Sequence, residues 1–108
     1  MDEGISYLLE QLQPLGAVSA RRMFGGYGIF CDGLMFALIA DEQLYFKVDS
    51  HNTGNYEQRD LPPFRYQRRH QWVELSYRLA PEELIDEADE LILWAADAVA
   101  AARRARGV

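Results

Sequence analysis

Three two-residue breaks divide an otherwise apolar stretch, residues 21–48, into runs of strand length. The breaks are Gly25-Gly26, Asp32-Gly33 and Asp41-Glu42. Gly-Gly and Asp-Gly favour tight hairpin turns, because such turns require positive φ at both central residues. The third pair is weaker turn chemistry, yet it is the only polar break between its two runs. The stretch therefore predicts an antiparallel meander of up to four strands, a scaffold that leaves little room for a catalytic loop.

Alternation and composition predict six strands in all. We place them near residues 19–24, 27–31, 34–40, 43–48, 64–68 and 71–77. In the last of these, Val73 and Leu75 alternate with polar residues, which indicates one wet face. In the third, both faces are apolar, so we expect a central strand that is covered on both sides. Its two predicted faces are Leu34, Phe36 and Leu38 on one side, and Met35, Ala37 and Ile39 on the other.

Two segments have the period of an amphipathic helix. Residues 3–13 carry an apolar stripe that Pro14 ends. The second helix is expected to begin at Pro81 and to keep one apolar face for about five turns, towards the arginines that precede Gly107. The sequence therefore predicts an α+β domain with an N-terminal helix, an antiparallel sheet of about five or six strands and a long C-terminal helix packed on it. The predicted core contains Phe24, Ile29, Phe36, Leu38, Phe46, Leu75, Leu91 and Ile92.

The composition is that of one globular domain, and we treat residues 1–108 as a single unit. Hydrophobic residues make up 49% of the chain. No apolar run approaches the ~20 residues that a membrane span needs. Asp2 and Glu3 give an acidic start, unlike a signal peptide, and the single cysteine, Cys31, cannot form an internal disulfide. Together these features predict a cytoplasmic protein with no membrane segment.

The common patterns of catalytic and cofactor sites do not occur. The run 25–28, Gly-Gly-Tyr-Gly, lacks the spacing of a phosphate-binding loop, and no helix is expected after it. His51 and His70 are far apart and have no cysteine pair beside them, and Cys31 suits a small buried hydrophobe. The acidic run 82–90 lacks the glycine of a calcium loop and is typical of a solvated helix face. We therefore expect no catalytic residue, no cofactor and no metal ligand.

Basic and aromatic residues gather in the segment that ends at Trp72, which also contains Arg65, Arg68 and Arg69. Arginines interleaved with aromatic rings can contact phosphates and stack on bases. They are also typical of a hairpin whose charges pair with the acidic last helix or with solvent. We favour this second interpretation, because a net charge of −6 argues against a general nucleic-acid coat.

Leu93 and Trp94 lie off the main apolar stripe of the last helix. If they are exposed, they mark a surface for a partner or a second copy. If they are buried, they only widen the core face of the helix. The sequence is equally consistent with both arrangements.

The turn motifs also carry a resemblance to a known family. The residues that carry it first are Arg22-Met23-Phe24-Gly25-Gly26-Tyr27-Gly28, followed by Asp32-Gly33-Leu34-Met35-Phe36. The likeness continues in the same order through Pro63-Phe64-Arg65-Tyr66 to the helix around Trp94. In these residues the chain resembles the N-terminal domain of the TfoX/Sxy family, the regulators of DNA-transformation competence. The resemblance covers nearly the whole chain.

This resemblance implies a secretion-chaperone-like fold and a regulatory role in transcription activation, in concert with a cyclic-AMP receptor protein. We accordingly expect a non-enzymatic interaction domain whose partner is a protein, such as the transcription machinery or a regulator. The alternative is a nucleic-acid-binding module that uses the basic aromatic hairpin 64–78. The family pattern leads us to expect glycines where this chain has Arg59-Asp60 and Arg69-His70. These departures make the basic hairpin partly specific to this chain.

The chain is also expected to form a homodimer. The central strands are apolar on both faces, but only two helices are predicted to cover them. If both helices pack on the same side, the other face needs a second copy or a partner.

Overall fold

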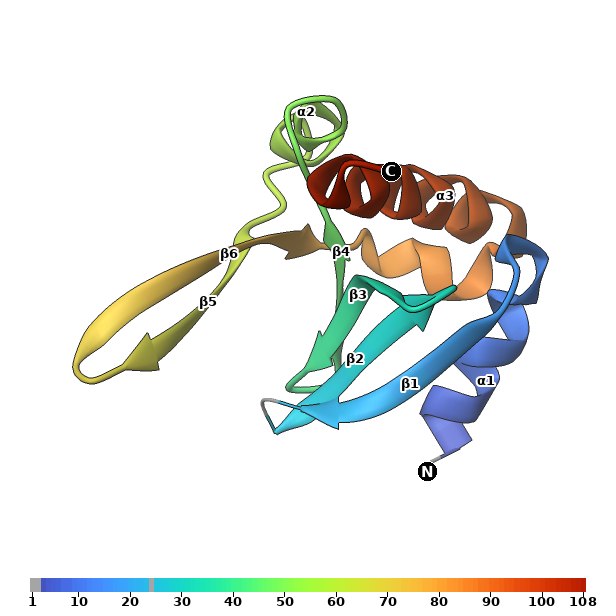
Figure 1. Ribbon diagram of the computed structural model, residues 1–108, viewed down its shortest axis with the longest axis horizontal. Coiled ribbons are helices and arrows are strands. Elements are labelled where there is room, and N and C mark those ends of the chain that lie inside the picture. Colours follow the sequence, from blue (N-terminus) through green and yellow to red (C-terminus); the bar gives the residue numbers. More distant parts are fainter. Residues whose placement is uncertain (1–2, 24) are drawn as a thin grey trace.

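The computed structural model describes residues 3–23 and 25–108. In these residues two α-helices and two 3₁₀ turns accompany a single six-stranded sheet, and a short third α-helix lies on the connection to the last hairpin (Figure 1). In chain order the elements are α1 (Glu3–Gln11), η1 (Gln13–Leu15), β1 (Val18–Met23), β2 (Gly26–Cys31), β3 (Leu34–Ala40), β4 (Gln43–Lys47), α2 (Thr53–Glu57), β5 (Pro63–Arg68), β6 (Gln71–Leu79), η2 (Glu82–Asp86) and α3 (Ala88–Arg106).

The sheet confirms the predicted α+β class and the antiparallel meander. Its strand order is β1-β2-β3-β4-β6-β5, and every neighbouring pair is antiparallel. Consecutive strands of the meander are therefore joined by tight turns, as the dipeptide breaks predicted. Asp32 and Gly33 both have positive φ, 49° and 83°, and so do Asp41 and Glu42, at 50° and 63°.

The first turn lies one residue earlier than predicted. Gly25 has a φ of 73°, whereas Gly26 already pairs with Met23 as the first residue of β2. Gly26 is needed for a different reason. A Cβ atom there would lie 1.8 Å from the carbonyl oxygen of Ile39 on the neighbouring strand. The second glycine of the pair therefore permits close approach of two backbones rather than positive φ.

The two predicted faces of β3 are wrong after its third residue, because the strand carries a β-bulge. In the pairing of β2 with β3, Ile29 faces Ala37 while Phe30 faces Met35, so Phe36 is the extra residue. A bulge shifts the alternation by one position, and every later side chain changes face. Leu34, Phe36, Ala37 and Ile39 consequently join one hydrophobic cluster, and Met35, Leu38 and Ala40 join the other.

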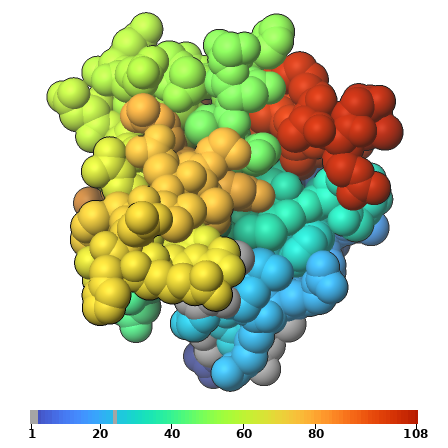
Figure 2. Space-filling view, turned by 60° about the vertical axis from the view of Figure 1, so that its left-hand side comes forward, coloured from blue at the N-terminus to red at the C-terminus, as the bar shows by residue number. Residues whose placement is uncertain are grey.

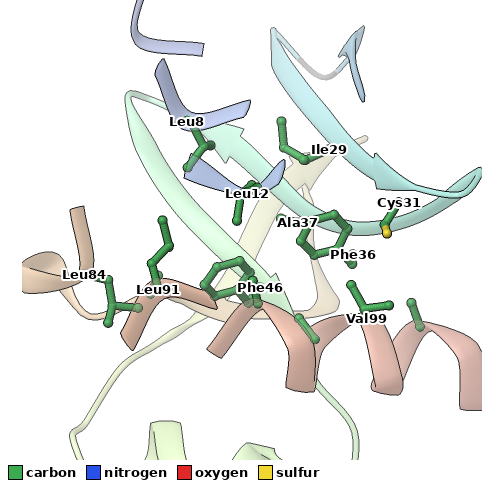
Figure 3. Close-up of a cluster of buried hydrophobic side chains, with 14 of the residues drawn as sticks. Leu8, Leu12, Ile29, Cys31, Phe36, Ala37, Phe46, Leu84, Leu91 and Val99 are labelled. Carbon is green, nitrogen blue, oxygen red and sulfur yellow. The ribbon is translucent and has the colours of Figure 1, made fainter. Parts of the chain in front are cut away.

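The larger cluster lies between the sheet and the helices. Leu8 and Leu12 of the N-terminal segment meet Phe36 and Phe46 of the sheet and Leu91 of α3 (Figure 3). Both long helices thus pack on the same side of the sheet. Within the predicted core, Ile29, Phe36, Leu38, Phe46 and Leu91 are buried, whereas Leu75 and Ile92 are half-buried; Phe24 lies outside the described residues.

The opposite side of β3 and β4 is covered by the base of the last hairpin. The second cluster joins Leu38 and Ala40 of β3 to Phe64 of β5 and Tyr77 of β6. The Tyr77 hydroxyl donates a hydrogen bond to the Met35 carbonyl at 3.3 Å, and burial raises its pKa to about 12. We expected the other face of the sheet to need a second copy or a partner if both helices packed on one side, and both helices do pack on one side. The hairpin of the same chain covers this part of the other face.

The predicted continuous helix from Pro81 is wrong, because it breaks at Glu87. Residues 82–86 form a 3₁₀ turn, Glu87 has an extended backbone (φ −129°, ψ 82°), and α3 begins at Ala88. A continuous helix would place Glu82 beside Asp86 and Glu83 beside Glu87, at spacing i,i+4. Like charges at that spacing destabilise a helix, so the acidic run disfavours the uninterrupted form. At the other end, Gly107 caps α3 in the left-handed conformation.

Candidate functional site

The candidate site is the hairpin of β5 and β6, which projects from the sheet at one end of the molecule (Figure 1). Its two faces differ, as the alternation predicted. Val73, Leu75 and Tyr77 are buried or half-buried, and Glu74 and Ser76 are exposed. At the base, the Phe64 ring meets the Tyr45 ring edge-on, with 5.1 Å between centroids. The hairpin is therefore anchored at its base and solvated along its other face and tip.

Trp72 is the most exposed aromatic side chain of this hairpin, with 68% of its surface accessible. It lies opposite Gln67, next to the cross-strand pair of Arg65 and Glu74, and hence on the wet face. Figure 2 turns this end of the molecule forward, and the yellow side chains of the hairpin stand at its front surface. A large apolar ring held in water on a rigid strand is a feature of interaction surfaces.

The turn of the hairpin holds two long side chains in an unfavourable backbone conformation. Arg69 and His70 have φ values of 52° and 66°. Asn and Gly are the residues that such a turn favours, because the left-handed region costs other residues roughly 1–2 kcal/mol each. Asp60 also has positive φ, at 55°. Three of the four positions where the family pattern led us to expect glycine, Asp60, Arg69 and His70, thus have glycine-like backbone angles.

The charges of the hairpin do not pair with the acidic run of residues 82–90. Arg65 bonds Glu74 across the hairpin, with Nε 3.2 Å from Oε1. Within the described part of the chain, no ion pair involves Arg68 or Arg69. The acidic run makes one pair there, between Glu83 and Arg59 of the loop after α2. Our favoured interpretation allowed pairing with the last helix or with solvent, and among the described residues these arginines meet solvent or Glu74 and not the last helix.

Leu93 and Trp94, which the sequence left open, have different environments. Leu93 is exposed, at 61%. Trp94 is half-buried; its ring meets Tyr56 edge-on at 4.9 Å, and the Arg59 guanidinium lies 5.3 Å from its centroid. Burial is the main reason that the pKa of Tyr56 is raised. Trp94 thus packs α3 against α2, away from the wet face of the hairpin.

The glycine motif forms the rigid part of the sheet. Arg22, Met23, Gly26 and Gly28 lie in the paired strands β1 and β2, and the turn of Asp32 and Gly33 leads into β3. A Cβ atom on Gly28 would lie 2.6 Å from the sulfur of Met23 and 3.2 Å from that of Met35. The motif therefore serves backbone packing. Phe24 belongs to it and lies outside the described residues.

One polar cluster was not predicted, and it ties the C-terminal helix to the loop after β4. The Arg104 guanidinium donates two hydrogen bonds to Asp49, at 2.6 and 3.1 Å. With the backbone N–H of His51, these bonds hold the pKa of Asp49 at about 2. The loop is closed by Asn52, which is buried and bonded to the backbone of Asp49 and Lys47. Only the separation of 55 residues hid this pair.

The described residues give little support for a metal site, a membrane-spanning helix or a reactive thiol. No group of three or more His, Cys, Asp or Glu side chains there could hold a metal ion, and no helix there is long and apolar enough to cross a bilayer. Cys31 is buried, and its burial, ahead of the charge of Asp32, raises the pKa of the thiol. A buried thiol with a raised pKa is a poor nucleophile.

Comparison with known proteins places this fold and motif in one family. The family model of the TfoX N-terminal domain matches residues 10–102. The chain belongs to the TfoX N-terminal domain family. No curated protein matches the chain. The TfoX N-terminal domain is not a known enzyme family, and membership supports a competence-related regulatory domain.

Proposed function

We propose that this TfoX N-terminal domain is a non-enzymatic regulatory module that binds a protein partner through the β5–β6 hairpin. The observation that carries the proposal is the exposure of Trp72, at 68%, on a hairpin whose base is anchored in the sheet. Trp and Arg are the side chains most enriched among residues that dominate binding energy at interfaces. A rigid strand also presents its ring with little loss of conformational freedom on binding.

The turn of the hairpin supports the same assignment. Arg69 and His70 occupy positions where smaller residues would make the domain more stable. Backbone strain that a chain retains is often found at functional sites, where the side chains matter more than the lost stability. Arg68 and Arg69 have no ion pair within the described residues, so both charges are available to a partner.

The charge balance favours a protein over a nucleic acid as the partner. Binding to a phosphate backbone draws its affinity from several cationic contacts. Here the net charge is −6, and Glu74 neutralises Arg65, which leaves two unpaired arginines on the hairpin. The second candidate remains nucleic-acid binding by the segment 64–78, because Trp72 beside arginines could stack on an unpaired base. We infer that the protein partner is a transcription regulator or a component of the transcription machinery, and that the contact forms in the cytoplasm.

Affinity capture with matched variants tests the proposal. The hairpin variant carries Arg68→Glu, Arg69→Glu and Trp72→Ala, and the control carries Arg106→Glu and Tyr7→Ala, which are also exposed. We expect a protein that the wild type and the control capture and the hairpin variant does not, with binding then reproduced by the purified partner in calorimetry. Equal capture by both variants, with both still folded, would refute the hairpin as the site.

A mobility-shift titration separates the second candidate. Binding of single-stranded or duplex DNA that falls steeply with salt and is lost in the hairpin variant would favour nucleic acid. If DNA does not shift at low salt, nucleic-acid binding is excluded and the protein partner stands.

A further inference from the structure

The charges of the molecule are separated along its longest axis, which measures 38 Å. In Figure 1 the turn of the hairpin lies at the left end, and the orange turn that leads into α3 lies at the right end. The first end carries Arg68, Arg69 and His70. The second carries the acidic surface, which we define as Asp86, Glu87, Asp89, Glu90 and Leu93.

The acidic surface presents two kinds of exposed group to a partner, unpaired carboxylates and one apolar side chain. All four of its carboxylates are exposed, and none of them has an ion-pair partner among the described residues. Leu93 is 61% exposed and follows Asp89 and Glu90 at i+4 and i+3, so the three side chains are neighbours on one helix surface. A surface of exposed carboxylates with one apolar side chain is complementary to a surface of unpaired arginines with an exposed aromatic ring.

The hairpin of the same chain has that composition but cannot supply the contact internally, because the two surfaces lie at opposite ends. We propose that the acidic surface is the docking site for the β5–β6 hairpin of a second copy of this chain. Two copies that lie side by side and antiparallel place each hairpin at the acidic surface of the other. Such an arrangement is a closed two-fold pair, in which the same contact forms twice.

This inference deepens the proposed function and rests on it, because it names one occupant of the hairpin. It also implies regulation, since a hairpin that is docked on a second copy cannot bind another partner. Self-association then competes with the partner, and the domain is most available to the partner when it is dilute.

Charge reversal followed by mixing tests the contact. The hairpin-reversed variant carries Arg68→Glu and Arg69→Glu, and the acid-reversed variant carries Asp89→Arg and Glu90→Arg. Each variant alone brings like charges together, so we expect both to be monomers in sedimentation at concentrations where the wild type is dimeric. An equimolar mixture makes both contacts complementary again, and we expect it to form a heterodimer. In either variant alone we expect the dissociation constant of the pair to rise at least about tenfold.

The control variant, Glu10→Arg with Arg106→Glu, reverses exposed charges outside both surfaces and should dimerise like the wild type. If the acid-reversed variant melts early, Asp89→Asn with Glu90→Gln removes the charges more gently. A wild type that stays monomeric at several hundred micromolar would overturn the inference, as would variants that dimerise unaltered or a mixture that does not recover.

Failure of the second-copy contact and failure of the proposed function give different experimental results. An acid-reversed variant that is monomeric and still captures the external partner supports both ideas. A monomeric wild type whose partner capture depends on Trp72 overturns the second copy alone. If partner capture ignores the hairpin, while the mixture recovers the dimer, only the external partner is refuted.

Discussion

Relieving the backbone strain at the tip of the hairpin should stabilise the fold and weaken binding at the same time. The double variant Arg69→Asn with His70→Gly replaces two residues at φ 52° and 66° with the pair that this turn favours. The left-handed region costs roughly 1–2 kcal/mol for each ordinary residue, and the new glycine loses about 0.5–1 kcal/mol through the entropy of the unfolded chain. Over the two residues these terms leave a net gain of about 1–3 kcal/mol in the free energy of unfolding.

Urea denaturation followed by tryptophan fluorescence measures that gain, and capture of the partner measures the loss. The turn between β3 and β4 offers a matched control, because Asp41 and Glu42 have nearly the same backbone angles, 50° and 63°. Asp41→Asn with Glu42→Gly should stabilise by a smaller amount, about 0.5–1 kcal/mol, since aspartate tolerates this region better than arginine. The control should leave capture unchanged. A hairpin variant that gains no stability, or one that gains stability and binds as before, would contradict the reasoning.

Three further predictions concern the sheet and its contacts with the helices and loops of the domain. Phe36→Ala should cost about 3–5 kcal/mol in urea melts, because Phe36 is 0% exposed; a loss below ~1 kcal/mol would mean that its site collapses around the gap. Gly26→Ala should cost about 1–3 kcal/mol, since a Cβ atom would lie 1.8 Å from the Ile39 carbonyl, whereas an unchanged melting curve would show that β2 and β3 can separate freely there. Arg104→Ala should lower the free energy of unfolding at pH 7, and the difference from the wild type should disappear in acid. The stability difference disappears in acid because the pKa of Asp49 is lowered from 3.8 to about 2. The contribution of the pair to stability is therefore present above pH 3.8 and is lost as pH falls through 2. A stability difference that persists at lower pH would argue against this pair.

Local chemistry made most of the sheet predictable. The Asp32-Gly33 and Asp41-Glu42 turns appear where the sequence breaks, and the strand bounds differ from the prediction by at most two residues. The alternation after Gln71 gave the wet and buried faces of β6 correctly. These features depend on neighbours within a few residues, which is the range that a sequence pattern reports.

Two of the errors come from dependence on distant parts of the chain, and the third, at Glu87, has a local cause. The bulge at Phe36 arises in the pairing of β3 with β2, and no residue type near Phe36 indicates an extra residue in the strand. The break at Glu87 reflects like charges that the periodicity of the apolar face conceals. The pair of Arg104 and Asp49 joins residues 55 positions apart.

The candidate site was predictable in composition but not in its surroundings. The segment that ends at Trp72 was recognisable from its arginines and aromatic rings. Whether those arginines meet the acidic run depends on where the hairpin and the start of α3 lie in space. The turn of the hairpin and the start of α3 lie at opposite ends of the molecule (Figure 1). The sequence also gave no measure of exposure, which is what distinguishes Trp72 from Trp94.

Site-directed photo-crosslinking tests the central claim, that the hairpin is the binding surface, most directly. A photoreactive phenylalanine at Trp72 is compared in cells with one at Tyr7 of α1, which is also exposed, at 51%. We expect a covalent adduct to a protein, either the partner or a second copy, from position 72 and none from position 7. Adducts from α1 alone, or the same adducts from both positions, would contradict the account.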